Sequence, residues 1–177
     1  MVFTVFHYLA VAPLQFKFRD KVDPVALALS SMLIDIEPLT GFYTGNYHWV
    51  LHSFTGAIIF SILLALIVRF LEKRDSFIIR FSHRILRMER RKYGFGGIVL
   101  TSLLGGVSHV LVDAFTHRNY PYVLFPFKAS ENPFWKGFEI GHAVQALMII
   151  LSLISVYLWF RNAFLNKTYR KSFYFSK

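Results

Sequence analysis

The chain contains no cysteine among its 177 residues. That absence excludes disulfides, thiolate metal ligands and cysteine nucleophiles. Acidic residues are also scarce, with 10 Asp and Glu against 20 Lys and Arg, so the formal net charge is +10. Such a balance is typical of nucleic-acid binding, of contact with anionic lipid, or of membrane topology signals.

Apolar residues, by contrast, are abundant: 55% of the chain is hydrophobic and Phe occupies 20 positions. This favours a multi-span membrane protein over a soluble domain.

Three long segments contain no Lys, Arg, Asp or Glu, namely residues 38–68, 93–112 and 140–160. Each approaches the ~20 residues that a helix needs to cross a hydrocarbon core of ~30 Å. We therefore expect membrane-spanning helices over about residues 50–70, 97–117 and 140–160.

Two shorter apolar pieces, residues 3–16 and 24–39, flank a charged hairpin at residues 17–21. Pro24 suits the first turn of a helix, and Pro38 predicts that the second piece ends there with Glu37 outside helical conformation. Both are short for a full crossing, so they are either tilted spans or half-helices packed inside the protein. The predicted fold is all-α: a polytopic membrane helical bundle of three spans and two short N-terminal membrane helices, in one domain over residues 1–177.

The basic residues lie in blocks between the apolar segments. Nine Lys or Arg lie within residues 69–92 against three acids, and five more lie in the tail, residues 161–177. The positive-inside rule makes both segments cytoplasmic in an integral protein of the cell membrane. Because topology explains these charges, no nucleic acid is expected as a partner.

An amphipathic helix is predicted within residues 69–92. Its apolar positions recur at helical spacing opposite several arginines: Phe77, Ile78, Phe81, Ile85 and Met88. This pattern is typical of a cytoplasmic helix lying on anionic lipid headgroups.

Histidines and acids gather at the opposite, extracytoplasmic face. His109, Asp113 and His117 follow one another at intervals of four, as do His48 and His52, so each set shares one helix face. Imidazole and carboxylate groups aimed at one point suit a divalent ion, with Zn²⁺ the first choice and room for one or two ions. The alternative is a hydrogen-bonded polar stripe that holds the helices together. The metal ligands that we predict are His7, Asp35, His48, His52, His109, Asp113 and His117.

Two acids stand close together before Pro38. Asp35 and Glu37 lie at the carboxyl end of a short helix, where acids oppose the helix dipole. This mismatch favours a functional role, in which one acid ligates a metal and the other, Glu37 or Asp35, is the catalytic base.

Several short motifs, taken in order, resemble the YdjM-like family of membrane-bound metal-dependent hydrolases, also described as LexA-binding, inner-membrane-associated hydrolases. They are Phe6-His7, the acidic motif of residues 31–38, the His-x₃-His-Ser block of residues 48–53, the Gly-x₂-Ser-His-x₃-Asp block of residues 106–113, and the Pro-containing stretch of residues 122–126. The resemblance implies functional roles for His7, Asp35, Glu37, His48, His52, His109 and Asp113. Two positions depart from the family pattern: Ile34 replaces a Pro, and Trp49-Val50-Leu51 replaces a segment that contains Arg.

These observations predict a membrane-embedded, metal-dependent hydrolase whose site lies near the extracytoplasmic membrane face. A site at the membrane rim suits a substrate with a lipid tail and a polar head, such as a lipid-like ester or a phosphodiester. The alternative is a non-enzymatic membrane protein, either a metal transporter or a helix-packing scaffold. Membrane lipids are the partners expected in each case.

Overall fold

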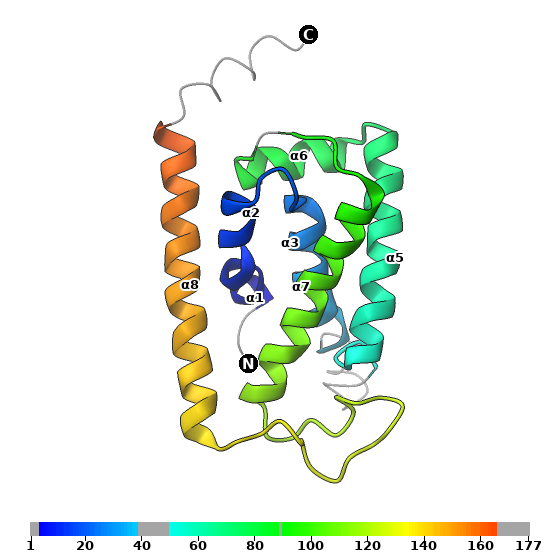
Figure 1. Cartoon of the computed structure of the whole chain (residues 1–177), viewed down its shortest axis with the longest axis vertical. Helices are drawn as coiled ribbons and strands as arrows, with labels where there is room; N and C mark the ends of the chain where they lie inside the picture. The colour runs from blue at the N-terminus through cyan, green and yellow to red at the C-terminus, as the bar shows by residue number, and fades with distance from the viewer. Residues whose placement is uncertain (1–3, 39–49, 89, 166–177) are drawn as a thin grey trace.

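The computed structural model describes residues 4–38, 50–88 and 90–165, and all regular elements in these ranges are helical. Figure 1 shows them as an elongated bundle with α8 along one side and α5 along the other. The predicted all-α membrane bundle is confirmed. In chain order the elements are α1 (Thr4–Val11), α2 (Pro13–Lys17), α3 (Pro24–Met32), the 3₁₀ turn η1 (Leu33–Asp35), α5 (Phe54–Lys73), α6 (Phe77–Leu86), α7 (Phe95–Thr116) and α8 (Phe138–Leu165).

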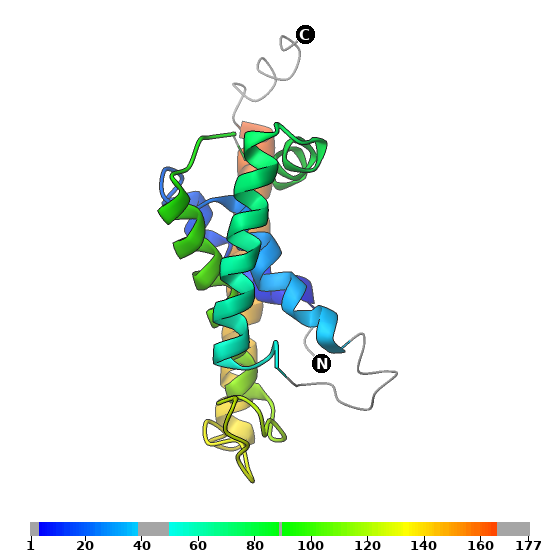
Figure 2. The same cartoon turned by 90° about the vertical axis from the view of Figure 1, so that its right-hand side faces the viewer.

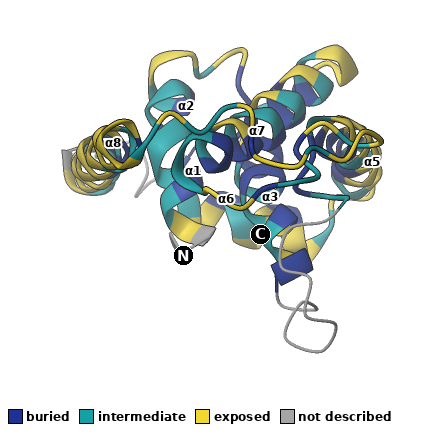
Figure 3. Ribbon diagram, turned by 90° about the horizontal axis from the view of Figure 1, so that it is seen from below, coloured by how far each residue is buried: buried dark blue, intermediate teal, exposed yellow. Residues whose placement is uncertain are grey.

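Three of the described helices, α5, α7 and α8, are long and apolar enough to cross a membrane, and they correspond to the three predicted spans. Their outward faces carry large apolar side chains, including Leu100 and Leu153, which are 70% and 65% exposed. Seen from one end, the exposed residues lie on the outer surfaces of α5 and α8, and buried residues gather between them (Figure 3). Lipid contact removes the cost that such a surface has in water. The chain is therefore an integral membrane protein.

Helix α5 begins at Phe54, about four residues later than predicted. Ser53 is its N-cap, because its backbone is extended and its hydroxyl accepts a hydrogen bond from the Gly56 amide at 2.9 Å. The preceding residues form turns instead. His52 therefore lies just outside the helix rather than on its first turn.

The two short N-terminal pieces form α1 with α2, and α3 with η1, joined by the charged hairpin. Asp23 caps α3 by accepting hydrogen bonds from the amides of Val25 and Ala26 at 2.8 and 3.0 Å, and Pro24 occupies the first turn as expected. The prediction that Pro38 forces Glu37 out of helical conformation is wrong, since residues 36–38 are helical. Pro38 is the third residue of the helical segment that begins at Ile36. Proline is tolerated there, because the first amides of a helix have no intrahelical hydrogen-bond partner.

Helix α7 packs closely against both α3 and α5 through two glycines. A β-carbon added at Gly105 would lie 2.1 Å from Ser30 Oγ, and one added at Gly106 would lie 2.2 Å from Ser61 Oγ. Only the absence of a side chain allows this approach. Because His109 follows one turn later, the same contact brings its ring against α3. Figure 2 shows α3 and α7 crossing behind α5.

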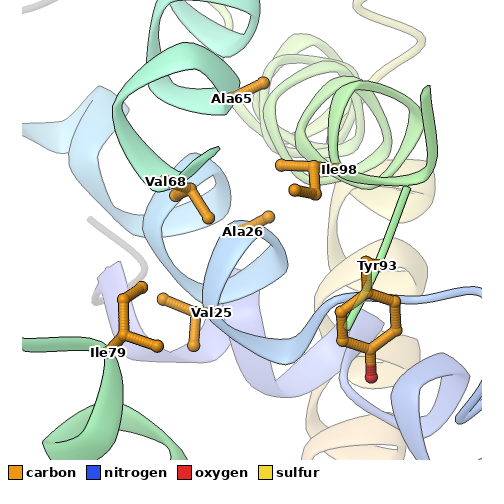
Figure 4. Close-up of a cluster of buried hydrophobic side chains, with 7 residues drawn as sticks. All are labelled: Val25, Ala26, Ala65, Val68, Ile79, Tyr93 and Ile98. Atoms are coloured by element: carbon orange, nitrogen blue, oxygen red, sulfur yellow. The ribbon is translucent and has the colours of Figure 1, made fainter. Parts of the chain in front are cut away.

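An apolar cluster closes the end of the bundle that carries the basic segments. It joins residues from α3, α5, α6 and α7 with Tyr93, as Figure 4 shows. Its members are Val25, Ala26, Ala65, Val68, Ile79, Tyr93 and Ile98. This apolar end cluster packs α3, α5, α6 and α7 together at the basic end of the bundle.

Helix α6 lies across this end of the bundle (Figure 1) and presents Phe77, Ile78, Phe81 and Ile85 as exposed side chains. Met88 does not share that face, because α6 ends at Leu86 and Arg87 takes a left-handed conformation that turns Met88 inward.

On the inner face of α6, His83 is buried. Burial lowers the pKa of His83 below 6.5, Arg90 lowers it further, and Asp23 partly offsets both.

Candidate metal centre

Four donor groups meet at the end of the bundle opposite α6. His109 and Asp113 lie one turn apart on α7, Asp35 ends η1, and His52 precedes the Ser53 cap of α5. Among the described residues they form the group that could hold a metal ion, with one ligand atom of each within 4.8 Å of all the others. Except for Asp35, these residues are buried.

The spacing of the donor atoms fits a small tetrahedral ion. Asp35 Oδ1 lies 3.3 Å from both His52 Nε2 and His109 Nε2, and Asp113 Oδ2 lies 3.3 Å from His109 Nε2 and 3.8 Å from His52 Nε2. Ligand atoms bound at 2.0–2.1 Å to a tetrahedral ion lie about 3.3 Å from one another. Within the described part of the chain, His109 Nε2 is buried and has no hydrogen-bond partner. A bound cation would satisfy that atom.

Both ligand rings are oriented through their other nitrogen. His109 Nδ1 lies 2.7 Å from the backbone carbonyl of Ser31, and His52 Nδ1 lies 2.9 Å from Glu37 Oε2. A metal-binding histidine usually donates its second N–H to such an acceptor, which sets the tautomer and the ring orientation. Here both acceptors hold the rings with Nε2 towards the cluster.

Glu37 is a positioning group for His52. Its Oε1 accepts a hydrogen bond from the Leu51 amide at 2.9 Å, and its Oε2 accepts one from the His52 amide at 3.1 Å as well as facing the ring. Burial disfavours the charged ring of His52, but Asp35 and Glu37 outweigh it and raise the pKa of His52 above 6.5.

His7 and His117 lie beside the four-residue group. His7, from α1, stacks on the His109 ring with centroids 3.8 Å apart, and its Nε2 lies 3.4 Å from Asp113 Oδ1. His117 is the C-cap of α7, and its Nδ1 lies 3.6 Å from the same oxygen. Of the seven predicted ligands the structure thus brings six together: His7, Asp35, His52, His109, Asp113 and His117. His48 lies outside the described residues.

The segment between α7 and α8 supports the site. The Tyr120 hydroxyl donates to the carbonyl of His52, and Asn132 Nδ2 donates to the carbonyls of Ala114 and His117 at 2.7 and 2.6 Å. Tyr120 is completely buried, and burial together with the nearby acids raises its pKa, so the hydroxyl stays protonated. Sequence reasoning missed Tyr120 and Asn132, because nothing in a loop of mixed composition marks which side chains fold back.

Two side chains of the centre are partly exposed. The side chains of Asp35 and His117 keep 18% and 24% of their exposure, whereas those of His7, His52, His109 and Asp113 keep 4% or less. Leu33 and Ile36, on either side of Asp35 in the chain, are exposed apolar residues. Exposed apolar side chains therefore adjoin Asp35, one of the two partly exposed groups of the centre.

Comparison with known proteins gives a family without an assigned activity. Residues 1–173 match a family model described as "Domain of unknown function (DUF4184)". No curated protein and no solved structure matches the chain.

Proposed function

The chain belongs to the DUF4184 family, and we propose that it is a membrane-embedded metal-dependent hydrolase of a lipid-like ester or phosphodiester. The observation that carries the proposal is the orientation of His52 and His109, whose Nδ1 atoms are anchored so that both Nε2 atoms face Asp35 and Asp113. A merely structural polar cluster does not need every donor to face one point.

The donor set favours Zn²⁺ or a similar divalent ion, since two imidazoles and two carboxylates suit it. Such an ion would supply Lewis acidity, and it would lower the pKa of a water that binds as a fifth ligand beside the four groups from the chain. The chain supplies the rest. Asp35 is the more exposed of the two carboxylates in the group, at 18% of its side chain against 4% for Asp113, so we assign it to accept the proton that water loses on attack. Glu37 contacts the amides of Leu51 and His52 and the His52 ring, so we assign it to position His52.

The surroundings favour an amphiphilic substrate. Leu33 and Ile36 flank Asp35 in the chain and are exposed. An acyl chain can lie along this surface while a polar ester or phosphodiester reaches Asp35. The resemblance of the sequence motifs to YdjM-like hydrolases supports the same reaction class.

The ends of the bundle support an orientation. The donors lie at one end, and the basic segment of α6 lies at the other. By the positive-inside rule the α6 end is cytoplasmic and the metal centre is extracytoplasmic. Phe77, Ile78, Phe81 and Ile85 would then enter the inner leaflet, with Arg80 and Arg84 at anionic headgroups.

A metal carrier is the competing function, and the apolar end cluster counts against it. A carrier needs a polar path from the donors to the other end, whereas Val68, Ile79 and Ile98 fill that end of the bundle.

The test is metal analysis and hydrolysis by the detergent-purified protein. We expect the purified protein to contain Zn²⁺ or a similar divalent ion in stoichiometric amount. It should hydrolyse a chromogenic phosphodiester in mixed micelles, and this activity should stop when a chelator is added and return when the metal is restored. His109→Ala should lose both, whereas His142→Ala, an exposed histidine at the start of α8, should keep both. Protein without bound metal, or a His109→Ala variant with unchanged metal content, refutes the proposal.

A further inference from the structure

The two oxygens of the Asp113 carboxylate face different sets of histidines. Oδ2 faces His109 and His52, at 3.3 and 3.8 Å from their Nε2 atoms. Oδ1 faces His7 Nε2 at 3.4 Å and His117 Nδ1 at 3.6 Å. Asp113 thus lies between two pairs of imidazoles, and the four-residue group described above uses only one of its oxygens.

The distances on the Oδ1 side are those of shared ligation rather than of hydrogen bonds. An N–H···O hydrogen bond joins atoms about 2.7–3.2 Å apart, and both Oδ1 distances are longer. They lie close to the separation of about 3.3 Å between neighbouring ligands of one tetrahedral ion. Asp113 Oδ1 is also buried, and it has no hydrogen-bond partner among the described residues. A buried carboxylate oxygen without a partner is costly, and a cation removes that cost.

We propose that the centre binds two divalent ions bridged by Asp113. The first is held by Asp35, His52, His109 and Asp113 Oδ2, and the second by Asp113 Oδ1, His7 Nε2 and His117 Nδ1. This inference rests on the proposed metal centre and adds to it a second ion with three ligands from the chain.

The second site differs from the first in having three ligands from the chain instead of four. His117 Nδ1 also lies 3.1 Å from Thr116 Oγ1 and 3.2 Å from the carbonyl of Asp113, and ligation exchanges these contacts for a metal bond. With three ligands from the chain, one position of a tetrahedral ion is left for water or substrate. Since the His117 side chain is 24% exposed, a phosphodiester oxygen can take that position. Paired ions of this kind stabilise both the attacking and the leaving oxygen of a displacement.

The experiment measures metal content in the full-length, detergent-purified chain after dialysis against zinc. The wild type should hold two ions per chain, the His7→Ala/His117→Ala variant one, and the His142→Ala control two. A wild type that saturates at one ion overturns the proposal, as does a double variant that still holds two.

A second measurement covers the case in which the double variant does not fold. Wild-type protein loaded with Mn²⁺ should give the electron paramagnetic resonance spectrum of an exchange-coupled pair, because one carboxylate joins the ions. Two magnetically isolated ions, or one, refute the bridged arrangement. Two coupled ions without any hydrolysis would support the bridged pair and refute the hydrolase activity. Hydrolysis with a single bound ion would support the hydrolase activity and refute the bridged pair.

Discussion

Replacing Glu37 separates a positioning role from a catalytic one. Among the described residues its side chain meets three donors: the Leu51 amide at Oε1, and both the His52 amide and ring at Oε2. Glu37→Gln keeps one oxygen, which can serve the two His52 donors, but its NH₂ group then faces the Leu51 N–H. Glu37→Ala loses all three contacts. The two variants therefore form a graded series.

The expected effect is on metal affinity. Loss of the acceptor that orients a ligating histidine typically weakens metal binding 10–100-fold, or about 1.4–2.8 kcal/mol. We expect Glu37→Gln to lie near the lower limit, since His52 keeps its acceptor, and Glu37→Ala to lie near the upper limit. The matched control is Glu139→Gln, which changes an exposed acid at the start of α8.

The assay is a competition titration of zinc against a chelator of known affinity, in detergent, with hydrolysis measured in parallel. If Glu37 were instead the catalytic base, hydrolysis would collapse while zinc affinity stayed at the wild-type value in both variants. That outcome would refute the positioning role derived from the three contacts.

Three further predictions follow from the packing, the orientation and the buried histidine of α6. Gly105→Ala should destabilise the protein by about 1–3 kcal/mol, because the new methyl group meets Ser30 Oγ and the backbone of Leu27 and Ser31; a variant with the unfolding temperature of the wild type would contradict the close α3–α7 contact. Since the chain has no native cysteine, Lys128→Cys should react with a membrane-impermeant thiol reagent on intact cells and Arg80→Cys should react only after lysis; the reverse pattern would invert the proposed topology. The folded-state pKa of His83 is below its unfolded value, so the unfolded chain binds more protons and stability falls as pH drops below about 6.5. His83→Leu should flatten that fall in unfolding temperature, and an equally steep fall in the variant would show that other groups cause it.

The spans and part of the site could be predicted from the sequence because both depend on local patterns. Three uncharged segments correspond to α5, α7 and α8, and the spacing of His109 and Asp113 needs only one helix to place both on one face. The prediction that Asp35 and His52 lie near His109 and Asp113 came from topology. The positions of the basic segments place all the candidate ligands at one end of the bundle.

Other features depend on contacts between distant segments, and local patterns do not carry them. The prediction for Pro38 treated the proline as a helix stop, yet it lies in a first turn where it is tolerated. Met88 fits the apolar period of α6, but the left-handed Arg87 breaks that period one residue earlier. The carbonyl of Ser31, which orients His109, could be found only once α3 and α7 were placed together.

Helix α8 contributes no donor to the centre, but its Ser155 hydroxyl donates to the carbonyl of Leu9 at 2.5 Å and so holds α1, which carries His7. His52, His109, Asp35 and Asp113 are instead braced by α3, α5 and α7. Helix α1 also packs on α3 through Tyr8 and Leu27, so helices on both of its sides fix the position of His7. A substitution of Ser155 would therefore reach the centre through α1 and the His7 ring, far along the chain from the donors that α3, α5 and α7 carry.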